Sequence, residues 1–523
     1  MRTSASETGV ARDWLHRLAP TYKLWVLPVF LLQAVFFWFV SQHRLIDADE
    51  GFYTLAARLV LQHKVPYLDF FYQQAPLLPY AYAAWLKLTG TSWFAARAFS
   101  GLLVAALGAA IFEHVCHETG KWLAGTFAVI VFASSSSVFG WLPIAKPFGL
   151  ATLFLFLAYA VLARLSISSA GWLVALVGVA FGLSADTRSY VIGLAPVFLW
   201  WVWRVGQEGR GFRLLWFIGG LIIGLAPCIA FFVASPDVFL FNNLGYHGLR
   251  TNNGLIGAWR NKAKVLYLLF AGPDTGFQCS IVAALCAVLL PWRRFRTNAS
   301  LLAFLVALVL GGICVLPTPT AMQYFSMLMP FLIVAAVCLV SEYFARLRSV
   351  RTLALAGAVC AVLLAGFLAF GVRSFNWYLY TGGKVPGIFE QRNAQNWTLE
   401  QVTAVSAAID QLTTPGEPVL SFWPGYIFAS SADPYPDFEN QFGMGVSSYL
   451  SSEKRQKYHV ISESEIHSTL ALHRVRIAVV GNQGQFIGGA DYPGSIGLLE
   501  ANGYRVVRRM NETLIFQCCA SIQ

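Results

Sequence analysis

The chain has 523 residues, of which 57% are hydrophobic and only 12% are charged. This composition excludes an ordinary water-soluble protein, because so apolar a chain would not stay in solution. The formal net charge of +11 would suit a nucleic-acid partner, but many lysines and arginines cluster in short loops between apolar segments, as membrane topology requires. We therefore expect an α-helical polytopic membrane protein that binds no nucleic acid.

Eleven apolar windows follow one another, each near the roughly 20 residues that a membrane-spanning helix needs. They lie at about 22–41, 92–113, 121–140, 147–165, 171–186, 189–204, 212–234, 278–292, 299–316, 322–342 and 352–372. Within 171–204, the stretch "GLSADTRSYV" marks either the meeting of two short spans or the break of one helix. The first 20 residues lack a cleavable leader pattern, so the first span is expected to be an uncleaved anchor.

The distribution of charge predicts the orientation of these spans. With the N-terminus in the cytoplasm, the inward loops hold most of the arginines, as the positive-inside rule requires. An odd number of spans then places the C-terminal part outside. Six cations fall on that outer side against the rule, where they either snorkel to lipid headgroups or serve an anion: Lys146, Arg188, Arg250, Arg260, Lys262 and Lys264.

From residue 374 onward the sequence is mixed and polar, so residues 1–373 are expected to form the membrane domain and residues 374–523 a soluble domain. Expected helices at 399–412, 463–474 and 494–502 precede the strand-like runs "PVLSF", "RIAVVG" and "YRVVRRM". This alternation predicts a small α/β layer that closes with a hairpin near Asn511. The segments "FWPGYIFASS" and "PDFENQF" are expected to be surface loops or to line a route for an acceptor.

The first outer loop, residues 43–91, concentrates three carboxylates at the membrane lip. Asp47 and Glu50 have the spacing of a capping box, in which side chains satisfy free amides at a helix start. Asp49 is required by no cap, so it is a candidate functional acid. The helix that follows is expected to be amphipathic and to lie in the membrane interface, with one apolar face. That face comprises Phe52, Leu55, Ala56, Leu59 and Val60.

Aromatic residues crowd the rest of this loop, and their expected role is an interfacial belt. They are Tyr67, Phe70, Phe71, Tyr80 and Trp85. Elsewhere on the outer side, Gln323 and Tyr324 begin the tenth window, and a long loop carries His247 and Arg250.

The stretch "DADEGFYTLAARLVLQHKVPYLDFFYQQAPLLPY" after the first span resembles the first external loop of membrane glycosyltransferases of the GT-C superfold. The resemblance is closest to the branch containing protein O-mannosyltransferases and the aminoarabinose transferases of lipid A. It implies that Asp49 and Glu50 lie at the active site and that Tyr53 lines it. It extends in outline to the eleven spans and the outer C-terminal domain.

Two departures from that family pattern concern the donor phosphate. Many relatives carry Lys-Pro-Pro-Leu where this chain has Gln74-Ala75-Pro76-Leu77, and a second acid is replaced here by "AKPFG" with Lys146. Lys146 and Arg188 are the cations expected to take over the phosphate contact.

The resemblance implies a glycosyltransferase of the bacterial cytoplasmic membrane, which moves a sugar from a polyprenyl phosphate to a hydroxyl of a glycan, lipid or protein. Asp49 would be the general base and the anomeric carbon would be inverted. The expected catalytic residues are Asp49 and Glu50, and the expected substrate contacts are Tyr53, Gln74, Lys146, Arg188, Arg250, Gln323 and Tyr324. No cofactor or metal cluster is expected, although the D-x-D of Asp47 and Asp49 leaves a divalent cation open. The alternative is a transporter or flippase of lipid-linked sugars.

Overall fold

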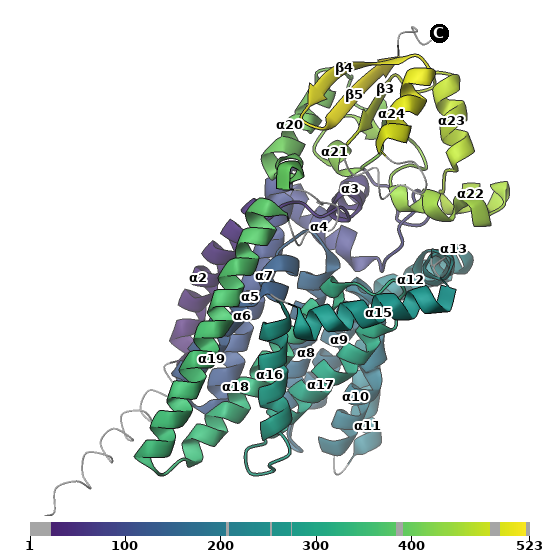
Figure 1. Cartoon of the computed structure of the whole chain (residues 1–523). Coiled ribbons are helices and arrows are strands. Elements are labelled where there is room, and N and C mark those ends of the chain that lie inside the picture. The colour runs from purple at the N-terminus through teal and green to yellow at the C-terminus, as the bar shows by residue number, and fades with distance from the viewer. Residues whose placement is uncertain are drawn as a thin grey trace, which may run out of the picture.

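The computed structural model describes residues 22–205, 209–250, 254–272, 275–382, 391–481 and 492–518. A bundle of long helices forms the lower part of the molecule, and a smaller α/β domain sits on one end of it (Figure 1). Between the two lies the outer loop with α3 (Glu50–Leu61) and α4 (Leu77–Thr89).

Helices occupy all eleven predicted windows. Five segments are long and apolar enough to cross a membrane alone: α2 (Tyr22–His43), α5 (Trp93–Thr119), α17 (Asn298–Val315), α18 (Met329–Arg346) with the 3₁₀ turn Met322–Leu328, and α19 (Val350–Asn376) with its extension to Thr381. Two more are bent pairs, α11 (Arg210–Gly224) with α12 (Ala226–Ala234) and α15 (Gly254–Ala271) with α16 (Thr275–Leu289). Shorter apolar helices fill the remaining four windows: α6 (Trp122–Ser134), α8 (Pro147–Ala163), α9 (Gly171–Thr187) and α10 (Ala195–Val205), which a 3₁₀ turn at Ser189–Leu194 precedes.

The break at "GLSADTRSYV" separates two helices, with Arg188 between α9 and the next 3₁₀ turn. Glycines let α9 pack backbone to backbone on α11: a Cβ added to Gly220 would lie 2.0 Å from the Ala175 carbonyl oxygen, and one added to Gly178 2.2 Å from that of Phe217. Small residues allow this close approach of membrane helices. The packing fixes the end of α9, and therefore Arg188, at the top of the bundle.

The C-terminal domain is a five-stranded mixed sheet in the order β2-β1-β3-β5-β4. Its strands are β1 (Pro418–Ser421), β2 (Asp433–Pro434), β3 (Ile477–Val480), β4 (Tyr504–Met510) and β5 (Thr513–Cys518), and its helices are α20 (Leu399–Asp410), α21 (Gly425–Phe428), α22 (Ser452–Tyr458), α23 (Glu463–Ala471) and α24 (Tyr492–Ala501). β1 and β3 are parallel, and β4 and β5 form the predicted hairpin around Asn511, which has a φ of 54°. The predicted helices and strands of this domain are confirmed, and β2 is an addition.

The expectation of an interfacial amphipathic helix at α3 is wrong. Every residue of α3 from Glu50 to Leu59 is buried, because α21 and the chain after it cover the side that was expected to be polar. Arg58 on that side is 7% exposed. Its guanidinium donates to the carbonyls of Ile427 at 2.5 Å and Ala432 at 2.7 Å and pairs with Asp433 at 3.1 Å. The polar face of α3 is thus satisfied by the C-terminal domain rather than by water.

Three aromatics of the expected interfacial belt are core residues instead. Tyr67, Phe70 and Phe71 are each 1% exposed. Tyr67 contacts the ring of Phe231 with 5.1 Å between centroids, and Phe71 contacts Tyr246 at 5.2 Å. The loop folds back on the ends of the helices that face the C-terminal domain, so these rings are covered by protein.

The two C-terminal segments expected as surface loops are also largely buried. Trp423, Tyr426 and Phe428 are at most 3% exposed. Trp423 stacks on Trp93 of α5, with 5.8 Å between ring centroids. Together with Arg58, these rings fasten the C-terminal domain to the bundle.

Candidate active site

A cavity of about 500 Å³ lies where the helix ends nearest the C-terminal domain, the loop at 43–91 and the C-terminal domain itself meet. Its lining includes every predicted site residue except Glu50: Asp49, Tyr53, Gln74, Lys146, Arg188, Arg250, Gln323 and Tyr324. These residues come from segments separated by up to 275 positions in the sequence. The fold therefore brings together in one chamber the acid and the cations that the sequence placed on one side of the membrane.

Lys146 is the centre of the polar cluster. Its Nζ lies 2.6 Å from Asp47 Oδ1, 2.6 Å from Asp49 Oδ2 and 2.6 Å from Gln323 Oε1. An ammonium group has three donors, so these contacts use all of them. Pro147 begins α8 and keeps Lys146 in an extended conformation at the N-cap, because the residue before a proline disfavours the helical region.

Burial alone would raise the pKa of Asp47, which is 2% exposed. The charges of Lys146 and Arg44 outweigh that effect and hold the pKa of Asp47 below its usual range. Burial lowers the pKa of Lys146, but the carboxylates of Asp47 and Asp49 raise it further than burial lowers it. The lysine and Asp47 therefore stay charged at neutral pH.

Asp49 occupies the N-cap of α3, yet its side chain makes no capping hydrogen bond. Its side chain is 29% exposed, far more than those of Asp47 and Lys146 beside it. Oδ2 pairs with Lys146, and among the described residues no hydrogen bond is made to Oδ1. Asp49 thus presents one carboxylate oxygen to the cavity.

Glu50 is placed outside the cavity and is 0% exposed. Its two oxygens accept from Arg97 Nε at 2.5 Å and Nη2 at 2.7 Å, from the Asp47 amide at 2.8 Å and from the Ala145 amide at 2.9 Å. The predicted capping box forms only in part, since Asp47 Oδ1 accepts from the Asp49 amide rather than that of Glu50. Glu50 therefore links three parts of the chain by hydrogen bonds: the start of α3 with Asp49, the loop with Lys146, and the first turns of α5.

Arg188 and Arg250 supply positive charge to the opposite part of the lining. The Arg188 guanidinium lies 5.3 Å from the ring centroid of Phe148, 5.0 Å from that of Tyr190 and 5.3 Å from that of Tyr324. It donates one N–H to Gln74 Oε1. The Nε groups of both arginines are buried without a partner in the described structure, and a buried donor normally has one. The pair is therefore able to receive an anion.

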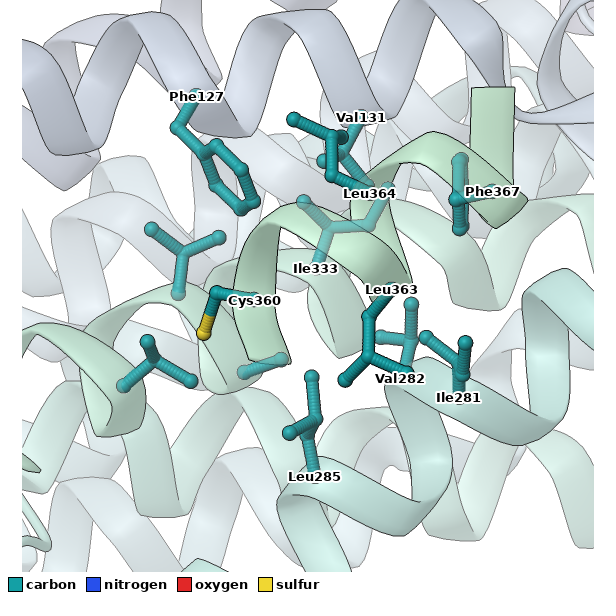
Figure 2. Close-up of a pocket in the computed structure, with 13 residues that line it drawn as sticks. Phe127, Val131, Ile281, Val282, Leu285, Ile333, Cys360, Leu363, Leu364 and Phe367 are labelled. Atoms are coloured by element: carbon teal, nitrogen blue, oxygen red, sulfur yellow. The ribbon is translucent and has the colours of Figure 1, made fainter. Parts of the chain in front are cut away.

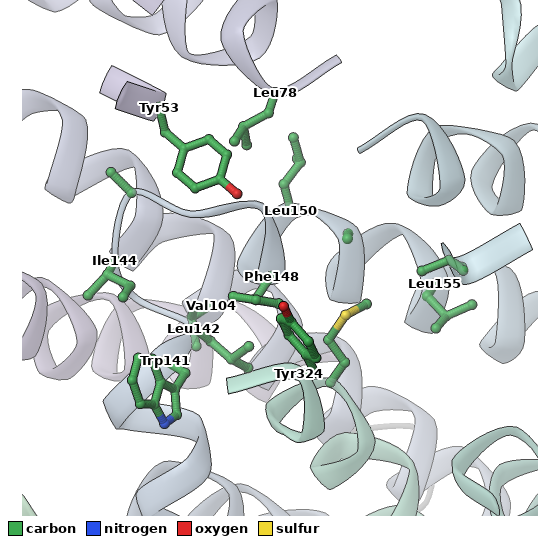
Figure 3. Close-up of a cluster of buried hydrophobic side chains, with 14 of the residues drawn as sticks. Tyr53, Leu78, Val104, Trp141, Leu142, Ile144, Phe148, Leu150, Leu155 and Tyr324 are labelled. Carbon is green, nitrogen blue, oxygen red and sulfur yellow. The ribbon is translucent and has the colours of Figure 1, made fainter. Parts of the chain in front are cut away.

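Tyrosines border these cations. Burial raises the pKa of Tyr53 despite the nearby charge of Arg188, so its phenol stays neutral and able to donate a hydrogen bond. Tyr53, Phe148 and Tyr324 also belong to the buried apolar cluster of Figure 3, together with Trp141 and Leu142. The cavity floor is thus continuous with the core of the bundle.

Several contributors were not singled out from the sequence. Phe442, Gly445 and Val446 of the C-terminal domain line the cavity, and the indole of Trp423 donates to the Ala48 carbonyl at 2.8 Å, between Asp47 and Asp49. The segments "FWPGYIFASS" and "PDFENQF" include or adjoin these residues, and lining a route was one of their two expected roles. Their aromatic content was the signal for burial.

Within the described ranges, no group of three or more His, Cys, Asp or Glu side chains is arranged to hold a metal ion. The position between the D-x-D carboxylates of Asp47 and Asp49 is taken by the ammonium of Lys146.

A second hollow lies within the bundle, between α6, α16, α18 and α19 (Figure 2). Its volume is about 60 Å³, and its lining is apolar apart from the thiol of Cys360. It offers neither a carboxylate nor a cation, so it lacks the groups that acid–base or phosphate chemistry needs.

Comparison with known proteins identifies the fold. No family model matches the sequence, and no curated protein matches it. Two solved structures of ArnT from Cupriavidus metallidurans superpose on 95% of this chain and 98% of theirs: the apo state with a TM-score of 0.63 and 16% identity, and the form bound to undecaprenyl phosphate with 0.61 and 14%. The GT-C fold expected from the outer-loop motif is confirmed.

Proposed function

We propose that this protein is a glycosyltransferase of the bacterial inner membrane that transfers a sugar from a polyprenyl phosphate to an acceptor hydroxyl. The observation that carries the proposal is the cavity in which one accessible carboxylate, Asp49, shares a lining with two guanidinium groups whose buried Nε atoms have no hydrogen-bond partner in the described structure. A neighbour in fold has been solved with undecaprenyl phosphate bound, which supports the class of donor. The N-terminus faces the cytoplasm in this proposal, and the cavity opens outward.

In the proposed reaction, Asp49 takes the proton of the acceptor hydroxyl. The resulting oxygen nucleophile attacks the anomeric carbon, the bond from that carbon to the phosphate oxygen breaks, and the configuration inverts. The free Oδ1 of Asp49 accepts the proton, while Lys146 holds Oδ2 in place. A positioned general base contributes about 10²- to 10⁴-fold to the rate.

The leaving group is a polyprenyl phosphate, which gains negative charge as the bond breaks. Arg188 and Arg250 are the proposed partners of that phosphate, with hydrogen bonds from Tyr53 and Tyr324. Fixed cations in a poorly hydrated site stabilise developing charge strongly. Gln74 orients Arg188 by accepting one of its N–H groups, and Glu50 acts as a positioning residue through its bonds to Arg97 and the Ala145 amide.

The test is transfer by purified protein from radiolabelled polyprenyl-phosphate sugars to membrane extracts. Asp49→Asn is expected to fold normally and to lose about 10²- to 10⁴-fold in rate. The matched control is Glu453→Gln, which neutralises an exposed carboxylate on α22 and should leave the rate unchanged. Unchanged transfer in Asp49→Asn would remove the base assignment. Movement of the lipid-linked sugar across vesicles without bond cleavage would favour a flippase.

A second experiment isolates the phosphate site. Binding of undecaprenyl phosphate alone, followed by native mass spectrometry in detergent, should weaken in Arg188→Gln and Arg250→Gln but persist in Asp49→Asn. Equal binding by all four proteins would show that these arginines do not hold the phosphate.

A further inference from the structure

The helix α15 differs from the helices around it in direction. It is bent by 74° from α16, and in Figure 1 it lies across the upper end of the bundle rather than along it. The sequence placed this segment in the outer loop at 235–277, between two spans. A helix in this position runs along the membrane surface if the bundle crosses the membrane.

Two faces of α15 have different surroundings. Val265 and Leu269, at 6% and 2% exposure, pack against the protein. An adjoining side bears large apolar side chains that the protein leaves uncovered: Leu255, Ile256, Trp259, Tyr267 and Phe270. At about 100° per residue these five positions fall within one side of the helix. Such a side suits the apolar boundary of a bilayer, with Trp259 and Tyr267 at interfacial depth.

Two cations lie along the edge of this apolar side. Arg260 and Lys264 are both exposed and one helical turn apart. The helix contains no aspartate or glutamate, and among the described residues neither cation has an ion-pair partner. Like charges at this spacing repel each other unless an anion neutralises them. An amphipathic helix with basic residues beside its apolar side is typical of binding to anionic lipid.

The inner polar residues of α15 connect it to the cavity. Lys262 Nζ donates to the carbonyls of Val315 at 2.6 Å and Pro317 at 2.9 Å, and Asn261 Oδ1 accepts from the Thr320 amide at 2.8 Å. Lys262 thus caps carbonyls at and just beyond the C-terminal end of α17. The chain continues directly into Pro319, Ala321 and Gln323 of the cavity lining, so the position of α15 fixes one wall of the cavity.

We propose that α15 is a binding surface for anionic phospholipid headgroups, which Arg260 and Lys264 contact while the apolar side enters the acyl layer. Through the hydrogen bonds of Lys262, the position of α15 on the lipid then determines the position of residues 315–323. This surface is distinct from the phosphate site of the proposed reaction, since neither Arg260 nor Lys264 lines the cavity. The inference stands whether or not the protein transfers sugar.

The first test measures lipid selectivity. The protein is placed in nanodiscs of phosphatidylcholine containing spin-labelled phosphatidylglycerol, and the fraction of label immobilised by the protein is recorded. A basic residue near an anionic surface strengthens binding about fivefold, so Arg260→Gln with Lys264→Gln should weaken the preference for phosphatidylglycerol roughly 25-fold. The control combines Lys454→Gln with Arg474→Gln, two exposed cations of the C-terminal domain, and should behave as wild type. Wild-type selectivity in the α15 variant, or an equal loss in the control, would overturn the proposal.

The second test measures the link to the cavity. Hydrogen exchange of the backbone at residues 315–323 should be slower in nanodiscs with phosphatidylglycerol than in phosphatidylcholine alone. Lys262→Met should remove that difference while lipid selectivity persists. Exchange that is independent of lipid in the wild type would refute the transmission through Lys262.

Discussion

Replacing Glu50 by glutamine separates a structural from a chemical role for this residue. Its carboxylate is fully buried and accepts from four donors, two on Arg97 and the amides of Asp47 and Ala145. Glutamine of the same shape turns one acceptor into a donor and leaves the Arg97 charge without a counter-ion. Breaking a buried pair in this way costs about 3–5 kcal/mol of folding stability.

The assay is chemical denaturation in detergent micelles, read from tryptophan fluorescence. Arg97→Gln should cost a similar amount, and the double variant should cost clearly less than the two single changes together, because it leaves no unpaired buried charge. The residual activity of folded Glu50→Gln should exceed that of Asp49→Asn. A Glu50→Gln protein as stable as the wild type but inactive would refute the structural role and would indicate that Glu50 takes part in the reaction itself.

Three other changes test the surroundings of the site. Trp423→Phe keeps an aromatic ring but removes the indole N–H, which leaves the Ala48 carbonyl without its donor. We expect a loss of about 1–3 kcal/mol in stability and slower transfer, checked by denaturation and initial rates. Lys146→Met removes the charge that lowers the pKa of Asp47, so Asp47 should take up a proton at a higher pH than in the wild type, which infrared titration of its carboxyl band would show. His459 hydrogen-bonds to Asp437, which raises the pKa of the imidazole although burial lowers it. The stability that protonated His459 contributes should be fully present below the imidazole's unfolded pKa of about 6.5. It should be lost as pH rises through the pKa of the folded state. Thermal melting across a pH series should show this dependence in the wild type and a flatter one in His459→Gln.

The sequence was sufficient to predict most helices and much of the cavity lining. The apolar windows needed only length and hydropathy, which are local properties. Lys146, Arg188 and Arg250 stood out because the positive-inside rule predicted them on the side of the membrane where cations are rare. Asp49 stood out because capping did not require it, and the structure indeed gives its side chain no capping bond.

The errors share one cause, which is that periodicity describes a face but not what covers it. α3 has a clear apolar side, so it was predicted to lie in the membrane interface. The carbonyls that satisfy Arg58 come from residues 427–432, some 370 positions away. The bond between Glu50 and Arg97 crosses 47 positions, and spacing on one helix cannot reveal it. Contacts of this kind depend on how the C-terminal domain docks.

The charges of the cavity agree with the proposed reaction at each stage. Of the residues in its lining, Asp47 and Asp49 are negative, and Lys146, Arg188 and Arg250 are positive, which leaves one positive charge for a donor phosphodiester with one negative charge. As the sugar leaves, the phosphate approaches a second negative charge, and the proton that reaches Asp49 removes one negative charge from the lining. Cavity and substrate therefore remain close to neutral together, and no uncompensated charge has to be buried at any step. This balance requires the proton to stay on Asp49 until the phosphate departs. Protonation of the product phosphate at low pH removes the second negative charge that the arginines hold, so release of the lipid product should become faster as pH falls. Release that is constant or slower at low pH would contradict this role of the arginines.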